Sequence, residues 1–353
     1  MDVVASRNNG EHVVSGEYAL QFQKWDLQIW MTLSGVSTNL VGRLVGPLTI
    51  EAPENSPASC TFDIYGWPNW LSEYDYDLQV KVRQINNLGV YTTYTLFTGY
   101  TYPVTRVPFS NVFNVQGFDI ATKLNKTEWE SDAITDHVTF IEEICAADSV
   151  TVNWLVTKTS STPHLGMYEK KGGYDFIREL LYTWGAYAEA TPAGELNVRD
   201  SSTKTTPDWA LTDTNMPNWE QLTVEKLDER QIINVQKVRN DEQDVLYELT
   251  DPGSVSYYGE QEGEVIDSRY IQNNYDAYNV ARETIHQSHC LYNVELPLIF
   301  LAELERGDTV SFYSASRGIT LKSPVRGYVH TLEPLTATAL TKASFSVRKK
   351  VNE

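Results

Sequence analysis

At 353 residues, with 41% hydrophobic and 12% aromatic side chains, the chain can bury sizeable cores and has the length of about two to three domains. Its 47 Asp and Glu against 28 Lys and Arg give a formal net charge of −19. This balance excludes a protein that grips nucleic acid through clustered basic side chains, but not one that lets nucleic acid pass without sticking.

The sequence also carries signals about cellular location. The cysteines Cys60, Cys145 and Cys290 lie far apart and make no disulfide framework, so we expect synthesis in a reducing compartment. The N-terminus has no basic region followed by an apolar core, as a secretion signal would have. No run approaches the roughly 18 apolar residues of a membrane helix, so no membrane insertion is expected.

The N-terminal third of the chain predicts β-structure. Residues 1–20 are polar and predict a loose N-terminal arm. Over residues 21–126, Leu27, Ile29 and Met31 alternate with other residues, similar runs follow, and Gly and Pro recur between them. Several short strands separated by turns predict a small β-barrel or sandwich. After residue 115, a corner at Gly117 should lead into a short helix.

Residues 127–205 predict a small α/β module. Apolar residues at helical spacing indicate one helix over residues 136–146 and a clearer one over residues 174–187, in which Ile177, Leu180 and Trp184 share a face. Strands are expected over residues 150–156 and 196–198. Residues 157–173 contain several Ser and Gly and predict a loop.

The C-terminal part returns to β-structure. The stretch around residues 200–222 is rich in Ser, Thr, Pro and Asp and predicts a linker over residues 206–223. Residues 224–353 predict a second β domain with a helical insertion at about residues 270–290, its helix over residues 274–287. The fold class is therefore α+β and mostly β. Strands are expected over residues 232–238, 245–249, 291–298, 309–313, 319–321, 325–332 and 343–347.

The segment most similar to a metal site is His286-Gln287-Ser288-His289-Cys290. Two His three residues apart with an adjacent Cys could supply ligands, but the spacing matches no standard site and no fourth ligand is evident. The alternative is the end of a helix that leads into a strand. We assign no metal and no cofactor to the chain.

Candidate catalytic residues are numerous but unspecific. Glu142-Glu143, or Asp75 with Asp77, could form a glycosidase pair. Because the chain has 47 carboxylates, many other pairs could be selected equally well, so neither pair is specific. Surface or core positions are favoured over a role as general base for four isolated histidines, His12, His137, His164 and His330. The 9 Trp are scattered and favour a core or subunit interface over a sugar-binding groove. We therefore assign no catalytic residue.

Two stretches of sequence are more informative than any catalytic motif. The first is LFTGY at residues 96–100, followed by VFNVQGFDIATKL at residues 112–124. The second contains YIQNNY at 270–275, VELPL at 294–298, LERGDTV at 304–310, GYVHTL at 327–332 and a last strand over 341–348. Their order and spacing resemble the baseplate hub proteins of contractile-tailed bacteriophages, of the late-control-D type, and the N-terminal half of VgrG-like spikes.

In that family an F-x-G strand and a G-x-D corner close a first barrel, and a P-G-D-x-V-like turn helps to close a second. Here the turn is RGDTV at residues 306–310, without the proline. The resemblance implies two tail-tube-like β-barrel domains joined by small α/β modules. Three copies would place six barrels in a ring, forming a homotrimeric baseplate hub that connects a hexameric tail tube to a trimeric spike and lines the DNA channel.

The resemblance also implies partners and a location. The partners are other copies of the chain, a tail tube or distal tube protein, a central spike protein and neighbouring baseplate wedge proteins, while DNA passes without specific binding. The location is the tail baseplate of the virion, after synthesis in the host cytoplasm. Two alternatives stay open: a virion-associated cell-wall hydrolase or glycan-binding tail protein, and a secretion-system spike hub. The second usually continues into a needle-like C-terminal β-helix, and no such repeat ends this sequence.

The acidic residues are concentrated in one segment. Residues 251–300 hold eight acidic and two basic residues, and the acidic ones cluster near its start. An acidic lumen would repel phosphate and so keep DNA from binding. A general solubility charge explains the excess equally well. The clustered residues are Asp251, Glu260, Glu262, Glu264 and Asp267.

Overall fold

The fold was analysed in a computed structural model of the chain. The structure describes residues 12–13, 24–33, 36–54, 56–66, 76–85, 90–101, 104–134, 136–156, 164–200, 206–212, 222–241, 244–314, 319–333 and 338–347. Apart from β1 (His12–Val13), the predicted N-terminal arm lies outside these residues. The chain is α+β and mostly β, as predicted from the sequence.

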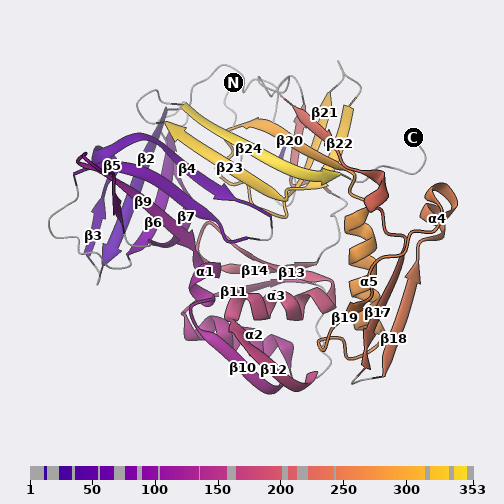
Figure 1. The fold of residues 1–353 in the computed structure, drawn as a ribbon. Coiled ribbons are helices and arrows are strands. Elements are labelled where there is room, and N and C mark those ends of the chain that lie inside the picture. The colour runs from indigo at the N-terminus through magenta and orange to yellow at the C-terminus, as the bar shows by residue number, and fades with distance from the viewer. Residues whose placement is uncertain are drawn as a thin grey trace.

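The largest element is a 12-stranded curved sheet (Figure 1). Its strands follow the order β16-β20-β24-β23-β4-β5-β9-β7-β6-β2-β3, and β8 pairs with β9. The N-terminal strands are β2 (Lys24–Leu33), β3 (Val36–Asn39), β4 (Leu44–Ala52), β5 (Ser59–Tyr65), β6 (Asp77–Ile85), β7 (Tyr91–Thr101), β8 (Thr105–Arg106) and β9 (Val112–Asp119), with a 3-10 turn at Val41–Arg43. The C-terminal strands are β16 (Thr223–Lys226), β20 (Tyr292–Ile299), β23 (Gly327–Glu333) and β24 (Thr338–Val347).

The two β regions of the sequence are joined within this sheet. Strand β4 pairs antiparallel with β23, which places Thr49 opposite Thr331 and Glu51 opposite Val329. We expected two separate barrels, whereas the described strands form one continuous sheet and close no barrel. Pairing β4 with β23 satisfies the backbone groups that two separate sheets would each leave at an open edge.

A second, 4-stranded sheet covers the C-terminal half of the core. Its order is β1-β15-β21-β22, with β15 (Trp209–Thr212), β21 (Thr309–Ser314) and β22 (Ile319–Pro324). Strand β15 lies in the segment predicted to be a linker. Its Trp209 and Leu211 alternate toward the core, where they pack with Val310 and Phe312 of β21. Burial of such large side chains fixes this connection against the sheet.

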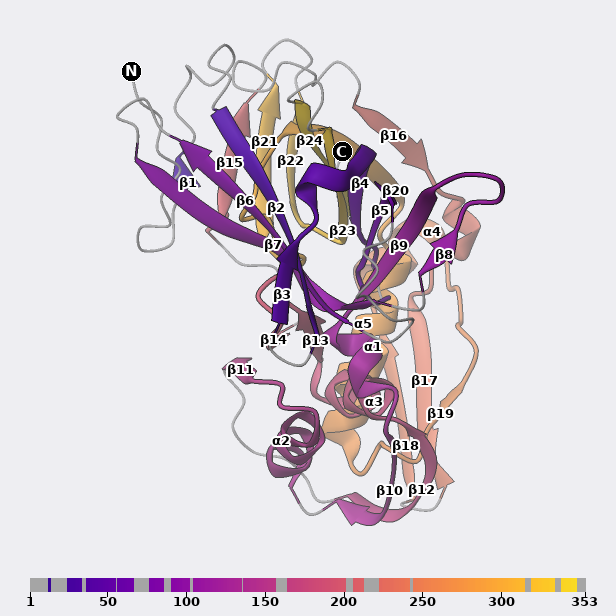
Figure 2. The same ribbon diagram turned by 90° about the vertical axis from the view of Figure 1, so that its left-hand side faces the viewer.

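The α/β module lies next to the large sheet, below it in the views of Figures 1 and 2. It contains α1 (Ile120–Leu124), β10 (Glu128–Ile134), α2 (His137–Ala147), β11 (Val152–Leu155), β12 (His164–Gly172), α3 (Gly173–Trp184), β13 (Ala186–Ala190) and β14 (Leu196–Asp200). Asp136 caps α2, and α3 begins as predicted. Helix α3 ends three residues earlier than expected because Gly185 adopts a left-handed conformation with φ of 65°, and β13 follows. Strand β12 occupies most of the predicted loop.

An outlying unit follows β16 and a 3-10 turn at Glu229–Gln231. It contains β17 (Val235–Asn240), β18 (Val245–Thr250), α4 (Pro252–Tyr258), β19 (Ile266–Asp267) and α5 (Asn274–Ser288), and its sheet has the order β18-β17-β19. The predicted helix over residues 274–287 is therefore present as α5. The strands expected over residues 232–238 and 245–249 belong to this unit rather than to the large sheet. Within the described residues, no helix is long and apolar enough to span a membrane.

Candidate functional site

The His and Cys side chains near residue 290 have structural partners. His289 is buried, its Nε2 lies 3.2 Å from Ser254 Oγ, and its Nδ1 lies 3.8 Å from an Asp251 carboxylate oxygen. Cys290 Sγ donates to the carbonyl of His286 at 3.5 Å. The His289 contacts tie the end of α5 to the start of α4, and the Cys290 contact closes the last turn of α5. No group of three or more potential metal ligands occurs among the residues that the structure describes.

The candidate acids and bases that the structure describes do not gather at one site. Trp154 Nε1 donates to Glu142 Oε1 at 2.9 Å, which makes Glu142 a partner of β11. His137 is buried against Trp184, and His330 Nδ1 lies 2.9 Å from Thr341 Oγ1 inside the sheet. Asp77 begins β6, while Asp75 and the side chains of His12 and His164 lie outside the described residues.

The F-x-G and G-x-D motifs meet where β7 crosses β9. Gly99 pairs with Asp119, and a Cβ on Gly99 would overlap the carbonyl oxygen of Phe118. A Cβ on Gly117 would overlap Leu78 Cδ2. Gly99 is therefore required for the close approach of β7 to β9, and Gly117 leaves room for the Leu78 side chain of β6.

Asp119 connects this crossing to the α/β module. Its Oδ1 accepts a hydrogen bond from the Ala121 amide at 3.0 Å and so caps α1. Its Oδ2 accepts one from the Ala58 amide, just before β5, at 2.6 Å. A single carboxylate thus holds the start of the module against the large sheet.

The R-G-D turn at residues 306–308 faces the same region. Gly307 has φ of 79°, and a Cβ there would overlap the hydroxyl of Tyr187. Asp308 Oδ2 accepts hydrogen bonds from Trp209 Nε1 at 3.0 Å and from the Glu305 amide at 3.1 Å. The turn is therefore pressed against β13 of the module and anchored in the core of the second sheet.

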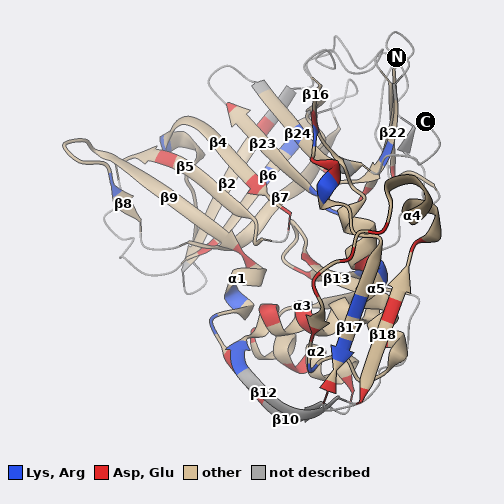
Figure 3. Ribbon diagram, turned by 45° about the vertical axis from the view of Figure 1, so that its right-hand side comes forward, with Lys and Arg blue, Asp and Glu red and all other residues tan. Residues whose placement is uncertain are grey.

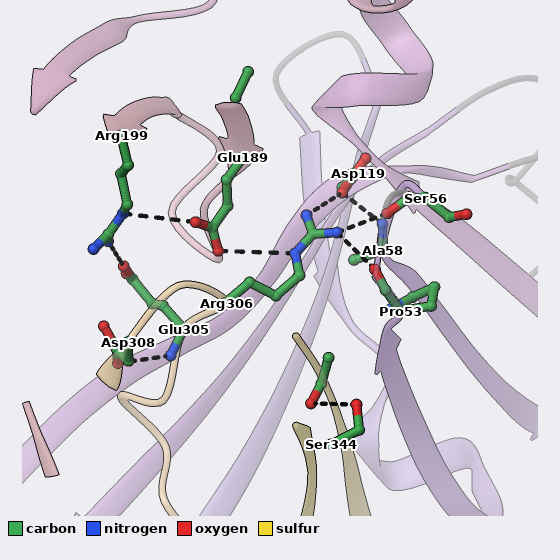
Figure 4. A network of polar contacts seen from close by, with 12 residues as sticks. Pro53, Ser56, Ala58, Asp119, Glu189, Arg199, Glu305, Arg306, Asp308 and Ser344 are labelled. Carbon is green, nitrogen blue, oxygen red and sulfur yellow. Dashed lines mark hydrogen bonds and ion pairs between the residues drawn. The ribbon is translucent and has the colours of Figure 1, made fainter. Parts of the chain in front are cut away.

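These motifs converge on a cluster that we call the polar junction, formed by Asp119, Glu189, Arg199, Glu305, Arg306 and Asp308 (Figure 4). Arg306 Nη1 donates to the carbonyls of Pro53 at 2.9 Å and Ser56 at 2.7 Å. Its Nε lies 3.8 Å from Glu189 Oε1, and its Nη2 lies 4.0 Å from Asp119 Oδ2. The guanidinium therefore contacts both the large sheet and the module.

Arg199 makes a second connection across the junction. Its Nη2 donates to Glu305 Oε2 at 2.9 Å, and its Nε lies 3.6 Å from Glu189 Oε2. The motifs named in the sequence located Asp119, Arg306 and Asp308 but not Glu189 or Arg199. The sequence signal for those two was weak: Glu189 is the charged residue of β13 (AYAEA), and Arg199 is one of two charged residues of β14 (LNVRD).

The polar junction holds more acidic than basic groups. Burial raises the pKa of Glu189 to about 8, even though Arg306 and Arg199 favour its ionised form. Burial likewise raises the pKa of Asp119 to about 6, against hydrogen bonds from backbone amides and the charge of Arg306. Burial thus favours the protonated form of Glu189, which lowers the excess negative charge in the junction.

The large sheet has a polar face on the side away from its core. Thr331, Thr49, Thr61 and Gln116 lie opposite one another on β23, β4, β5 and β9, and so form an uncharged row across both β regions. Two ion pairs stand on this face, Arg83–Asp26 at 2.7 Å and Lys342–Glu295 at 2.5 Å. We call this surface the open face.

The clustered acidic residues of the sequence lie elsewhere, on the outlying unit (Figure 3). Glu262 accepts from Lys237 Nζ at 2.5 Å, and Asp267 accepts from Arg239 Nε at 3.0 Å. Asp251 caps α4 through its bonds to the Gly253 and Ser254 amides. Part of this acidic cluster is therefore compensated by neighbouring groups, and the cluster belongs to the outlying unit rather than to the open face.

No protein-family model and no curated protein sequence matches this chain. Solved structures do share its fold. A tail protein from Neisseria meningitidis MC58 has a TM-score of 0.66 at 13% identity, over 91% of this chain and 96% of that chain. The 43 kDa tail protein of prophage MuSo2 from Shewanella oneidensis has a TM-score of 0.65 at 10% identity, over 92% and 100%. Prophage tail protein gp18 from Listeria monocytogenes EGD-e has a TM-score of 0.59 at 14% identity, over 92% and 96%.

Proposed function

We propose that the protein is a structural component of a phage-type tail tip, a homotrimeric baseplate hub that connects the tail tube to the spike and lines the DNA channel. The observation that carries the proposal is the fold shared, over 91% or 92% of the chain, with three proteins that are described as tail proteins. This likeness agrees with the order of motifs in the sequence, which independently resembles baseplate hubs.

The architecture supports a ring of copies. Each chain carries two curved β regions side by side in one sheet, so three chains would supply six of them. The sheet ends in two short edges, β3 and β16, of four residues each. Heterologous contacts in a closed ring allow such edges to be covered by the neighbouring copy.

The open face supports a role as the lining of a DNA channel. Its central row of Thr49, Thr61, Gln116 and Thr331 carries no charge, and its two arginine or lysine ion pairs are already neutralised by carboxylates. A surface without free basic side chains at its centre gives phosphate little to bind. DNA would therefore slide along it with low affinity.

The remaining parts of the proposal are partners and location. We place the protein in the virion baseplate, between a tube protein and a spike protein and beside wedge proteins. We also propose that its role is structural rather than enzymatic. The described candidate carboxylates support this, because Glu142 accepts a hydrogen bond from Trp154 in the α/β module, whereas Asp77 begins β6 of the large sheet.

The first test is the mass of the purified protein by light scattering after size exclusion, at micromolar concentration. We expect about three times the chain mass of 40.1 kDa, and rings in negative-stain images. A monomer that persists at these concentrations, without rings, would contradict the hub.

The second test asks which face lines the channel. We expect a ring of the variant T61K/Q116K to bind linear double-stranded DNA but not closed circular DNA, because only a free end can enter a lumen. The matched control is T250K/S256K, which adds the same charge to exposed positions of the outlying unit. Equal binding of linear and circular DNA by T61K/Q116K would place the open face outside the channel.

A further inference from the structure

The large sheet and the α/β module have separate apolar cores. The core of the two sheets runs from Leu27 to Phe345, whereas the module has its own core around Ile141, Ile177 and Leu180. No buried apolar residue belongs to both clusters among the described residues. Polar interfaces between parts of a chain permit relative motion more readily than large apolar ones.

The polar junction lies between these two cores. Arg306 is only 8% exposed, and it joins the β4–β5 loop of the sheet to Glu189 of the module. Arg199 of the module is bonded to Glu305 of the sheet region. Several buried atoms here lack a hydrogen bond within normal distance, namely Glu189 Oε2, Arg199 Nε, Arg306 Nη2 and Asp308 Oδ1. The attachment is therefore electrostatic and sensitive to the charge of its members.

We propose that the polar junction is a proton-dependent latch, in which neutral Glu189 lets the α/β module close against the large sheet and ionised Glu189 favours its opening. The closed state buries Glu189 between the guanidiniums of Arg199 and Arg306, in a junction of four carboxyl groups and these two cations, so a proton on Glu189 reduces the excess negative charge there. Opening would expose the side chain to water, where a carboxylate is readily ionised. The latch should therefore weaken as the pH rises.

As the pH rises, the other acidic groups around Glu189 either lose a proton, which also adds negative charge, or are already ionised, and the arginines keep their positive charge. From the sheet side, Asp119, Glu305 and Asp308 add negative charge, and burial raises the pKa of both Asp119 and Asp308. From the module side, Arg199 stays protonated, as does Arg306 of the turn.

The aromatic neighbours do not titrate in the relevant range. Burial raises the pKa of Tyr174 to about 12 and raises those of Tyr187 and Tyr328 as well. Arg326, whose charge also reaches Tyr187, is ion-paired to Glu54 at 3.1 Å. Asp119, with a pKa of about 6, is mostly ionised above pH 7, so the proton on Glu189 is the main variable from there to about pH 9.

The test is native-state hydrogen exchange of the full chain, read by mass spectrometry as protection factors corrected for the intrinsic effect of pH. We expect the protection of α1 and β13 in the wild type to fall at least tenfold between pH 6 and pH 9, while that of β6 stays constant. The variant E189Q, which carries a neutral side chain of the same shape, should show less than a threefold change.

Two arginine variants complete the design. R306M should lower the protection of α1 and β13 at every pH, whereas R83M, which breaks the ion pair between β6 and Asp26 of β2 in the large sheet, should leave them unchanged. A wild type with pH-independent protection, or an E189Q variant with the wild-type pH dependence, would overturn the latch. Because E189Q is conservative, the test stands even where R306M fails to fold.

Discussion

Replacing Gly99 by alanine should strongly destabilise the fold, because the crossing of β7 and β9 has no room for a Cβ atom. The added methyl group would overlap the carbonyl oxygen of Phe118 and lie 2.7 Å from its carbonyl carbon. Both are backbone atoms, so β9 itself must move away from β7. Overpacking of this kind costs about 1–3 kcal/mol and occasionally more, and partial loss of the β7–β9 hydrogen bonds adds to it. We expect a loss of about 3 kcal/mol or more.

Two other glycines provide graded comparisons. At Gly117 the overlapping atom is Leu78 Cδ2, the end of a side chain that can rotate, so G117A should cost about 1–3 kcal/mol. At Gly42 nothing lies within 4 Å and φ is not positive, so G42A should change stability by about 0.5 kcal/mol at most.

Urea unfolding followed by tryptophan fluorescence measures all three variants. The order of destabilisation should be G99A, then G117A, then G42A, with similar dependence on urea concentration. If G99A unfolded at the same urea concentration as G42A, the close approach of β7 and β9 would not be what requires the glycine.

Three further substitutions test separate parts of the fold. The Asp136 carboxylate caps α2 by accepting hydrogen bonds from the Val138 and Thr139 amides, so D136A should lower the free energy of unfolding in urea by about 1 kcal/mol. W209F removes the hydrogen bond to buried Asp308 and should cost about 1–3 kcal/mol, visible as a lower melting temperature; an unchanged melting temperature would argue against that bond. Burial lowers the pKa of His330 from 6.5 to about 3 in the folded protein. As the pH falls below about 6.5, His330 binds a proton in the unfolded state but not in the folded state, so the folded protein loses stability. H330Q should therefore reduce the loss of stability between pH 6.5 and pH 4.5, and an unaltered pH dependence would contradict this assignment.

Local sequence patterns predicted much of the secondary structure. The alternation of Leu27, Ile29 and Met31 gave β2, and the helix predicted over residues 136–146 is present as α2, His137–Ala147. Helix α5 agrees with its predicted range within one residue. The failures were local as well: β12 was taken for a loop because of its glycines, and β13 was joined to α3 across Gly185.

The candidate site was only half visible in the sequence. The motifs containing Asp119 and Arg306 were recognised as separate signatures, about 190 positions apart. Nothing in their spacing indicated that both approach Glu189 or that Arg306 reaches the β4–β5 loop. A buried ion-pair network depends on long-range packing, and a charged residue in a short strand looks the same in sequence whether it faces solvent or a partner.

The sequence by itself determined the fold class, most elements and the acidic charge, because these depend on periodicity, turn residues and composition within short windows. Only the tertiary structure decided how the elements are combined. The pairing of Thr49 with Thr331 joins two β regions into one sheet, and the strands around Val238 separate into an outlying unit. Such choices depend on which strand edges and apolar faces meet, and a chain can bring together residues at any separation. The net charge of −19 is a case in point, since only the structure shows that its densest cluster lies away from the open face.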